Sequence, residues 1–133
     1  MSFNMIPRLE SLGDLVNLRD LWLANNEIRR IKPILGGCKV LRTLELGANR
    51  IKKIEHLEML TSLQNLWLGK NRIMAIENLS ALTTLRKLDL QCNRITQIQG
   101  LDSLVLLQEL YLSHNRITRI ENLENLVRIK GKR

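Results

Sequence analysis

The stretch that decides the fold is Leu63-Gln64-Asn65-Leu66-Trp67-Leu68-Gly69-Lys70-Asn71-Arg72-Ile73, with the pattern L-x-x-L-x-L-x-x-N-x-I. The pattern recurs along the chain, and each copy carries one asparagine: Asn26, Asn49, Asn71, Asn93 and Asn115. The first two asparagines are 23 residues apart and the later ones 22 residues apart. A fixed period of this length predicts a solenoid in which every turn supplies one strand and a short return segment.

This signature is typical of leucine-rich repeats, an α/β class with a curved parallel sheet on the concave face and short 3₁₀ or α returns on the convex face. We expect strands near 20–23, 43–46, 65–68, 87–90 and 109–112. In returns such as 76–85 apolar residues stand at every third position, as in a 3₁₀-like or single-turn helix. The asparagine amides should bond the backbone of their own turn and of the neighbouring turn.

Residues 1–133 are expected to form a single domain of about five repeats, because stacked turns bury a shared aliphatic core. The return at 31–38 holds the extra residue, and Pro33, Gly36 and Gly37 predict an irregular bulge there. No C-terminal cap is evident. The last apolar set would have no neighbour beyond it: Leu107, Leu110, Leu112, Ile117, Ile120, Leu123 and Leu126. Pairing with a second copy through this open end is therefore an alternative to coverage by later residues.

Composition narrows the function classes. No apolar run approaches the roughly 18 residues of a membrane span, and the first residues lack the apolar core of a signal peptide. We therefore expect an intracellular protein, in the cytoplasm or nucleus, without a membrane partner. The two cysteines do not form a disulfide framework. Neither a metal-ligand spacing nor a phosphate-binding loop emerges, so no cofactor is expected.

Alternate residues of a strand face opposite ways, so the residues between the leucines should line the exposed sheet. They form three columns across the repeats. The first column is Asp20, Thr43, Asn65, Lys87 and Glu109. The second is Trp22, Glu45, Trp67, Asp89 and Tyr111. The third is Ala24, Gly47, Gly69, Gln91 and Ser113, small side chains expected to leave room for a partner.

The second column suggests a binding surface. Three of the chain's four aromatic residues fall in it, although aromatic residues make up only 3% of the chain. Tryptophan and tyrosine are enriched at interface hot spots, which favours a protein-binding site. The alternative is that aromatic residues simply suit strands. The predicted partner-binding residues are Asp20, Trp22, Glu45, Trp67, Asp89, Glu109 and Tyr111.

Charge supports a protein partner. The formal net charge is +8, but the first two columns carry four acids against Lys87, a net −3, which leaves +11 elsewhere. Phosphate would be repelled from such a sheet, so nucleic acid is not expected there. A basic patch on a protein suits it better.

A thiol site is the one enzymatic alternative. Cys92 and His114 occupy the same repeat position, about 5 Å apart if the turns stack, and Lys70 lies on the other side. Such neighbours can lower a thiol pKa. Two polar turn residues that happen to stack are the simpler explanation of the pattern, so we expect no enzyme activity.

Several pieces resemble the 22-residue repeats of the protein phosphatase 1 regulatory subunit 7 family. They are residues 46–51, 68–71, 76–79 and 109–115, and the resemblance spans about residues 15–126. It implies that the concave face grips a serine/threonine phosphatase catalytic subunit, with Trp22, Glu45 and Trp67 at the family's contact positions. Asp89 and Tyr111 extend the column by our reading of the residues alone.

The sequence thus predicts a non-enzymatic scaffold whose concave sheet binds a phosphatase catalytic subunit. The alternative function is an adaptor in a cytoskeletal, axonemal or RNA-associated complex that uses the basic convex side.

Overall fold

The computed structural model describes residues 17–33 and 37–124. Expectations for the first residues, for the centre of the bulge at 31–38 and for Leu126 lie outside this range. The extra residue of that return leaves the sheet in register, because Asp20 still pairs with Thr43.

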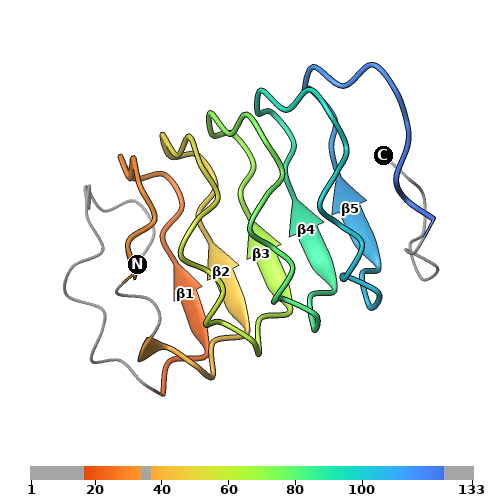
Figure 1. Ribbon diagram of the computed structural model, residues 1–133. Coiled ribbons are helices and arrows are strands. Elements are labelled where there is room, and N and C mark those ends of the chain that lie inside the picture. Colours follow the sequence, from red (N-terminus) through yellow and green to blue (C-terminus); the bar gives the residue numbers. More distant parts are fainter. Residues whose placement is uncertain (1–16, 34–36, 125–133) are drawn as a thin grey trace.

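Five short parallel strands follow one another across a single sheet, in the order β1-β2-β3-β4-β5 (Figure 1). Their bounds are Asp20–Trp22, Thr43–Glu45, Asn65–Trp67, Lys87–Asp89 and Glu109–Tyr111. Each is one residue shorter than the sequence predicted. Every pairing joins residues at the same repeat position, such as Leu44 with Leu66 and Leu66 with Leu88. The leucine-rich-repeat solenoid expected from the period is confirmed.

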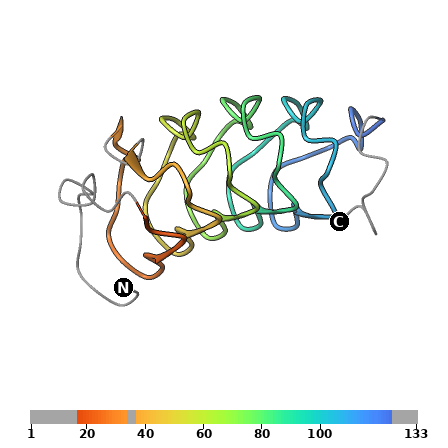
Figure 2. The same cartoon turned by 90° about the horizontal axis from the view of Figure 1, so that it is seen from below.

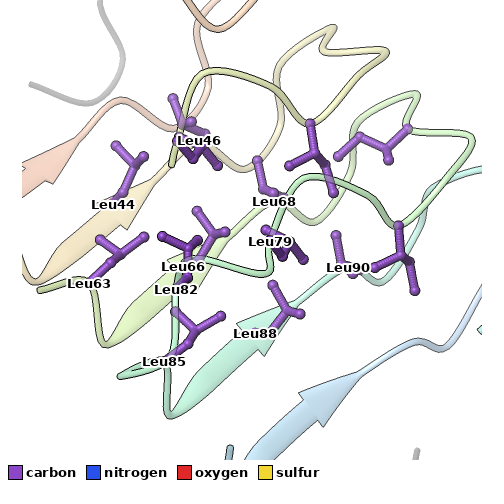
Figure 3. Close-up of a cluster of buried hydrophobic side chains, with 14 of the residues drawn as sticks. Leu44, Leu46, Leu63, Leu66, Leu68, Leu79, Leu82, Leu85, Leu88 and Leu90 are labelled. Atoms are coloured by element: carbon purple, nitrogen blue, oxygen red, sulfur yellow. The ribbon is translucent and has the colours of Figure 1, made fainter. Parts of the chain in front are cut away.

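The core is a stack of aliphatic layers behind the sheet (Figure 3). The central leucine of each strand points into it, and Leu44, Leu66 and Leu88 have no exposed surface. Leucines of the returns, such as Leu63 and Leu85 just before β3 and β4, are buried in the same cluster (Figure 3). Burying one such side chain contributes roughly 1.5–3 kcal/mol, and each turn can do so only against its neighbours.

The returns are successive tight turns with hydrogen bonds of the 3₁₀ type, as the three-residue spacing predicted. Leu60 N donates to Leu57 O at 3.0 Å and Leu63 N donates to Leu60 O at 3.1 Å, both bonds between residues three apart. The same pair of bonds recurs in the next two returns. They reproduce the three-residue spacing, but residues 17–33 and 37–124 contain no α-helix and none that could cross a membrane. Figure 2 shows the narrow coil that results.

The repeat asparagines join neighbouring turns, as predicted. Asn49 Nδ2 donates to Leu46 O of its own turn at 2.9 Å and to Leu23 O of the preceding turn at 3.0 Å. Its Oδ1 accepts the amide hydrogen of Ile28 at 3.1 Å. Asn71, Asn93 and Asn115 repeat this arrangement. Within the described range, no buried side-chain nitrogen or oxygen lacks a partner.

One repeat position in the returns has left-handed backbone in successive turns, which the sequence analysis did not predict. His56, Asn78, Gly100 and Asn122 have φ values of 61°, 60°, 69° and 59°. Asn78 Nδ2 donates to Ile54 O of the preceding turn at 2.7 Å, and Asn122 does the same to Ile98 O at 2.7 Å. Gly100 has no side chain to make the equivalent bond.

Replacing Gly100 by alanine and replacing it by asparagine should therefore change the stability of the fold in opposite directions. Gly100→Ala is expected to lower the free energy of unfolding by about 1 kcal/mol. Alanine would have to adopt left-handed backbone here, and its Cβ would lie 3.0 Å from Ile76 O. An asparagine Cβ would lie at the same place, but asparagine adopts left-handed backbone more readily, as Asn78 does here. Because its amide can also donate to Ile76 O, Gly100→Asn is expected to raise the free energy of unfolding by about 0.5–1 kcal/mol. Urea denaturation measures both. An alanine variant as stable as the asparagine variant would contradict the bonding explanation.

The last described turn is less enclosed than the others. Leu107 and Leu110 are buried, whereas Ile120 is 71% exposed. A hollow of about 310 Å³ lies between Leu112, Ile117 and Leu123. Dimerisation through this end stays a prediction.

Candidate protein-binding site on the concave sheet

The structure brings the predicted second column together on one face. We call Trp22, Glu45, Trp67, Asp89 and Tyr111 the aromatic–acid column. Each member is the last residue of its strand and is paired in register with the next member. Adjacent members are therefore one strand spacing apart, about 4.8 Å, and the two tryptophans about 10 Å.

The column is partly accessible to solvent. Trp22 is 48% exposed, and the other four side chains are half-buried. None belongs to the aliphatic core, whose described members are leucine, isoleucine and one cysteine. Trp67 stands between two acids, with Glu45 on one neighbouring strand and Asp89 on the other. An indole flanked by carboxylates is chemically suited to receive a lysine or arginine side chain of a partner.

Both acids are fixed by the turn that follows their strand. Glu45 Oε1 accepts the amide hydrogen of Gly47 at 2.6 Å, and Asp89 Oδ1 accepts that of Gln91 at 3.0 Å. A Cβ built on Gly47 would lie 2.8 Å from Glu45 Oε1, and one on Gly69 would lie 2.9 Å from Asp89 Oδ2. At these two positions the expectation for the third column was wrong, because the space is taken by the acids. Spacing alone could not show which side chain fills the room beside a glycine.

Burial perturbs both carboxyl groups. Loss of hydration raises the pKa of Glu45; the Gly47 amide opposes this shift, and the negative charge of Asp89 adds to it. Loss of hydration likewise raises the pKa of Asp89, against the lowering effect of its bond from Gln91. When ionised, these carboxylates lack part of the hydration they have in an unfolded chain. A cationic partner would compensate for that loss.

Neutral replacements of the two acids should stabilise the free protein. In Glu45→Gln/Asp89→Asn the amide oxygens can still accept the Gly47 and Gln91 bonds, while the buried charges are removed. Raised carboxyl pKa values mean that the native state holds more protons than the unfolded state between the ordinary and the raised values, so wild-type stability falls as pH rises through that window.

The double variant should therefore have a higher melting temperature than wild type at pH 7. Its advantage should vanish below the ordinary carboxyl pKa range, where both proteins are protonated. Thermal unfolding followed by circular dichroism at pH 7 and pH 3 measures this. The matched control is Glu58→Gln/Asp102→Asn, which changes two exposed acids on the returns. Equal changes in the two variants would contradict the assigned cause.

The first column is less uniform than predicted. Asp20 is exposed, but Thr43 is only 8% exposed and accepts a hydrogen bond from Asn65 Nδ2 at 3.2 Å. Lys87 Nζ lies 3.2 Å from Glu109 Oε2, and the Tyr111 hydroxyl donates to Glu109 Oε1 at 2.7 Å. Glu109 thus neutralises the lone lysine of the sheet and orients the Tyr111 ring, two roles that the sequence analysis missed.

The thiol alternative gains no support from the structure. Lys70, Cys92 and His114 share one turn position, as predicted, with φ values of 56°, 56° and 57°. Backbone bonds such as Cys92 N to Ser113 O at 2.9 Å account for the stacking. Over the described ranges, no hydrogen bond links the side chains of Cys92 and His114. No group of three potential metal ligands occurs there either.

The family follows from the fold and its repeats. The family described as leucine-rich repeats (two copies) matches residues 16–59 and 61–103, and a single leucine-rich repeat matches residues 106–126. The chain belongs to the leucine-rich-repeat family.

Within that family, the chain is 42% identical over 65 residues to an Arabidopsis thaliana protein named protein phosphatase 1 regulatory inhibitor subunit PPP1R7 homolog. The match covers 48% of this chain and 20% of that protein, so the chain spans only about a fifth of that relative.

Solved structures show the same fold. An internalin (inlF) from Listeria monocytogenes superposes with a TM-score of 0.87 at 31% identity, over 96% of this chain and 38% of the internalin. Internalin C2 from the same organism gives 0.85 at 28% identity, over 97% and 57%. The ectodomain of the Arabidopsis thaliana receptor kinase SOBIR1 gives 0.68 at 26%, over 80% and 61%.

Proposed function

We propose that this chain is a non-enzymatic scaffold whose aromatic–acid column binds the catalytic subunit of a serine/threonine phosphatase of the protein phosphatase 1 type. The observation that carries the proposal is the in-register file of two indoles, a phenol and two partly dehydrated carboxylates on an open sheet. A cytoplasmic or nuclear location accompanies it.

The chemistry of the column suits a basic protein surface. Aromatic side chains bury large area with few rotatable bonds, and they commonly act as hot spots. The carboxylates beside Trp67 gain most from a partner that brings positive charge, because their own hydration is incomplete. A phosphatase is supported as that partner by the likeness to the PPP1R7 homolog, whose name states a regulatory role on protein phosphatase 1.

Calorimetric titration of the purified phosphatase catalytic subunit with this chain tests the proposal. We expect saturable binding by wild type, and binding at least about tenfold weaker by Glu45→Gln/Asp89→Asn, equivalent to about 1.4 kcal/mol. The control Glu58→Gln/Asp102→Asn should bind as wild type does. Absence of wild-type binding would refute the choice of partner. Equal affinity of the column variant and wild type would refute the choice of surface.

A further inference from the structure

Four arginines form a line along a different edge of the solenoid. Arg50, Arg72, Arg94 and Arg116 each directly follow a repeat asparagine, beyond the carboxyl end of a strand. We call them the arginine ladder. Their backbone amides donate hydrogen bonds of 2.8 Å to backbone carbonyl oxygens of the preceding turn, those of Ile28, Ile51, Ile73 and Ile95 respectively. The turns therefore remain hydrogen-bonded here, and successive arginines start about one strand spacing, or 4.8 Å, apart.

The ladder is poorly neutralised by the chain itself. Arg50 Nη2 lies 3.4 Å from Glu27 Oε1. For Arg72, Arg94 and Arg116, all exposed, no acid in the described residues comes within the 4.0 Å of an ion pair. Like charges at directly opposed positions repel each other. An anion laid along the ladder would relieve that repulsion.

An open groove of about 600 Å³ broadens one end of the ladder. It is lined by Arg50 and Arg72 of the ladder and by four further cations: Arg29, Arg30, Lys52 and Lys53. Glu55 is the one acid in the lining, and its Oε2 is 3.9 Å from Arg30 Nε. Six positive side chains against one negative side chain give the groove a strongly positive lining.

The residue types of the site and their spacing indicate the class of anion. Single-stranded nucleic acid is held by aromatic stacking as well as by charge, and no aromatic residue lines the groove or belongs to the ladder. Guanidinium groups instead pair bidentately with carboxylates. Acidic residues four apart on a helix have Cβ atoms about 5–6 Å apart, close to the separation of successive rungs.

We propose that the arginine ladder and its groove bind an acidic segment of a protein, with carboxylates following one another at about one per rung. The carboxylates form forked hydrogen bonds to the exposed guanidinium groups, and Lys52 and Lys53 add attraction at the groove end. This surface has the opposite sign to the aromatic–acid column. The two sites can therefore hold different partners, and the ladder does not depend on the phosphatase proposal.

The experiment follows the fluorescence anisotropy of a rhodamine-labelled, alanine-based helical peptide with glutamates four residues apart along one face. At about 0.05 M salt, where charge screening is weak, we expect saturable binding that weakens as salt rises. Arg72→Gln/Arg94→Gln/Arg116→Gln should weaken it at least tenfold. Circular dichroism should show an unchanged fold, because the replaced side chains are exposed.

The chain contains a matched control. Arg19, Arg42 and Arg86 are also exposed and also share one repeat position, but they precede the strands, at the opposite end of the sheet. Arg19→Gln/Arg42→Gln/Arg86→Gln removes the same charge and should weaken binding of the peptide less than threefold. Equal losses in both triple variants, no binding by wild type, or tighter ladder-dependent binding of a single-stranded RNA would each overturn the proposal.

Discussion

Asn71→Leu is expected to lower the free energy of unfolding by at least about 3 kcal/mol. The Asn71 amide nitrogen donates to Leu46 O and Leu68 O, both at 3.0 Å, and Oδ1 accepts the amide hydrogen of Ile51 at 3.0 Å. Leucine has a similar volume but can satisfy none of these buried groups, and each unpaired group costs about 1–3 kcal/mol. Urea denaturation followed by circular dichroism measures the change.

Asn115→Leu is the matched comparison. Asn115 makes the same bonds to Leu90, Leu112 and Ile95, but it is only partly buried because it lies in the last described turn. Water can replace part of what is lost there, so we expect a cost of roughly half that at Asn71. An Asn71→Leu variant within about 0.5 kcal/mol of wild type would show that the asparagine bonds do not hold the turns together.

Trp22→Ala/Trp67→Ala should weaken binding of the phosphatase catalytic subunit at least about 100-fold, or roughly 2.7 kcal/mol. Truncating an aromatic hot spot costs about 2 kcal/mol or more, and this variant removes both indoles of the column. Neither ring is part of the aliphatic core. We therefore expect the melting temperature to change little while affinity is lost in the calorimetric titration.

Met59→Ala/Met74→Ala is the control for that variant. Met59 is 51% exposed and Met74 63% exposed, and both lie outside the strands. The pair removes two large apolar side chains from a surface that the proposal leaves uncovered, so affinity should stay within twofold of wild type. Similar losses from both double variants would move the interface away from the sheet.

The period of the sequence determined most of the fold. Because the repeat positions of leucine and asparagine are fixed, the strands, their register and the columns of the sheet could be read from the residues before any coordinates. Helix could not be separated from successive turns, because both place side chains at every third position. The left-handed position shared by Asn78 and Gly100 also escaped notice, although asparagine and glycine are the residues that adopt it most readily.

The site was predictable in outline and less so in detail. Register placed Glu45 and Asp89 beside Trp67, but it could not show that both carboxylates fold back onto the following turn. That geometry depends on side-chain torsions and on the space above Gly47 and Gly69. Strand alternation predicted Thr43 to be exposed, because alternation takes no account of side chains on the neighbouring strands. In the structure Thr43 is 8% exposed and hydrogen-bonded to Asn65.

The measurement that tests the central claim most directly is ¹⁹F NMR of this chain labelled with 5-fluorotryptophan. The sequence has two tryptophans, so the spectrum should show two signals, assigned with Trp22→Phe and Trp67→Phe. On adding unlabelled phosphatase catalytic subunit, the account predicts that both signals shift or broaden as the column is covered. Two unchanged signals, in a sample where calorimetry shows the complex formed, would contradict it.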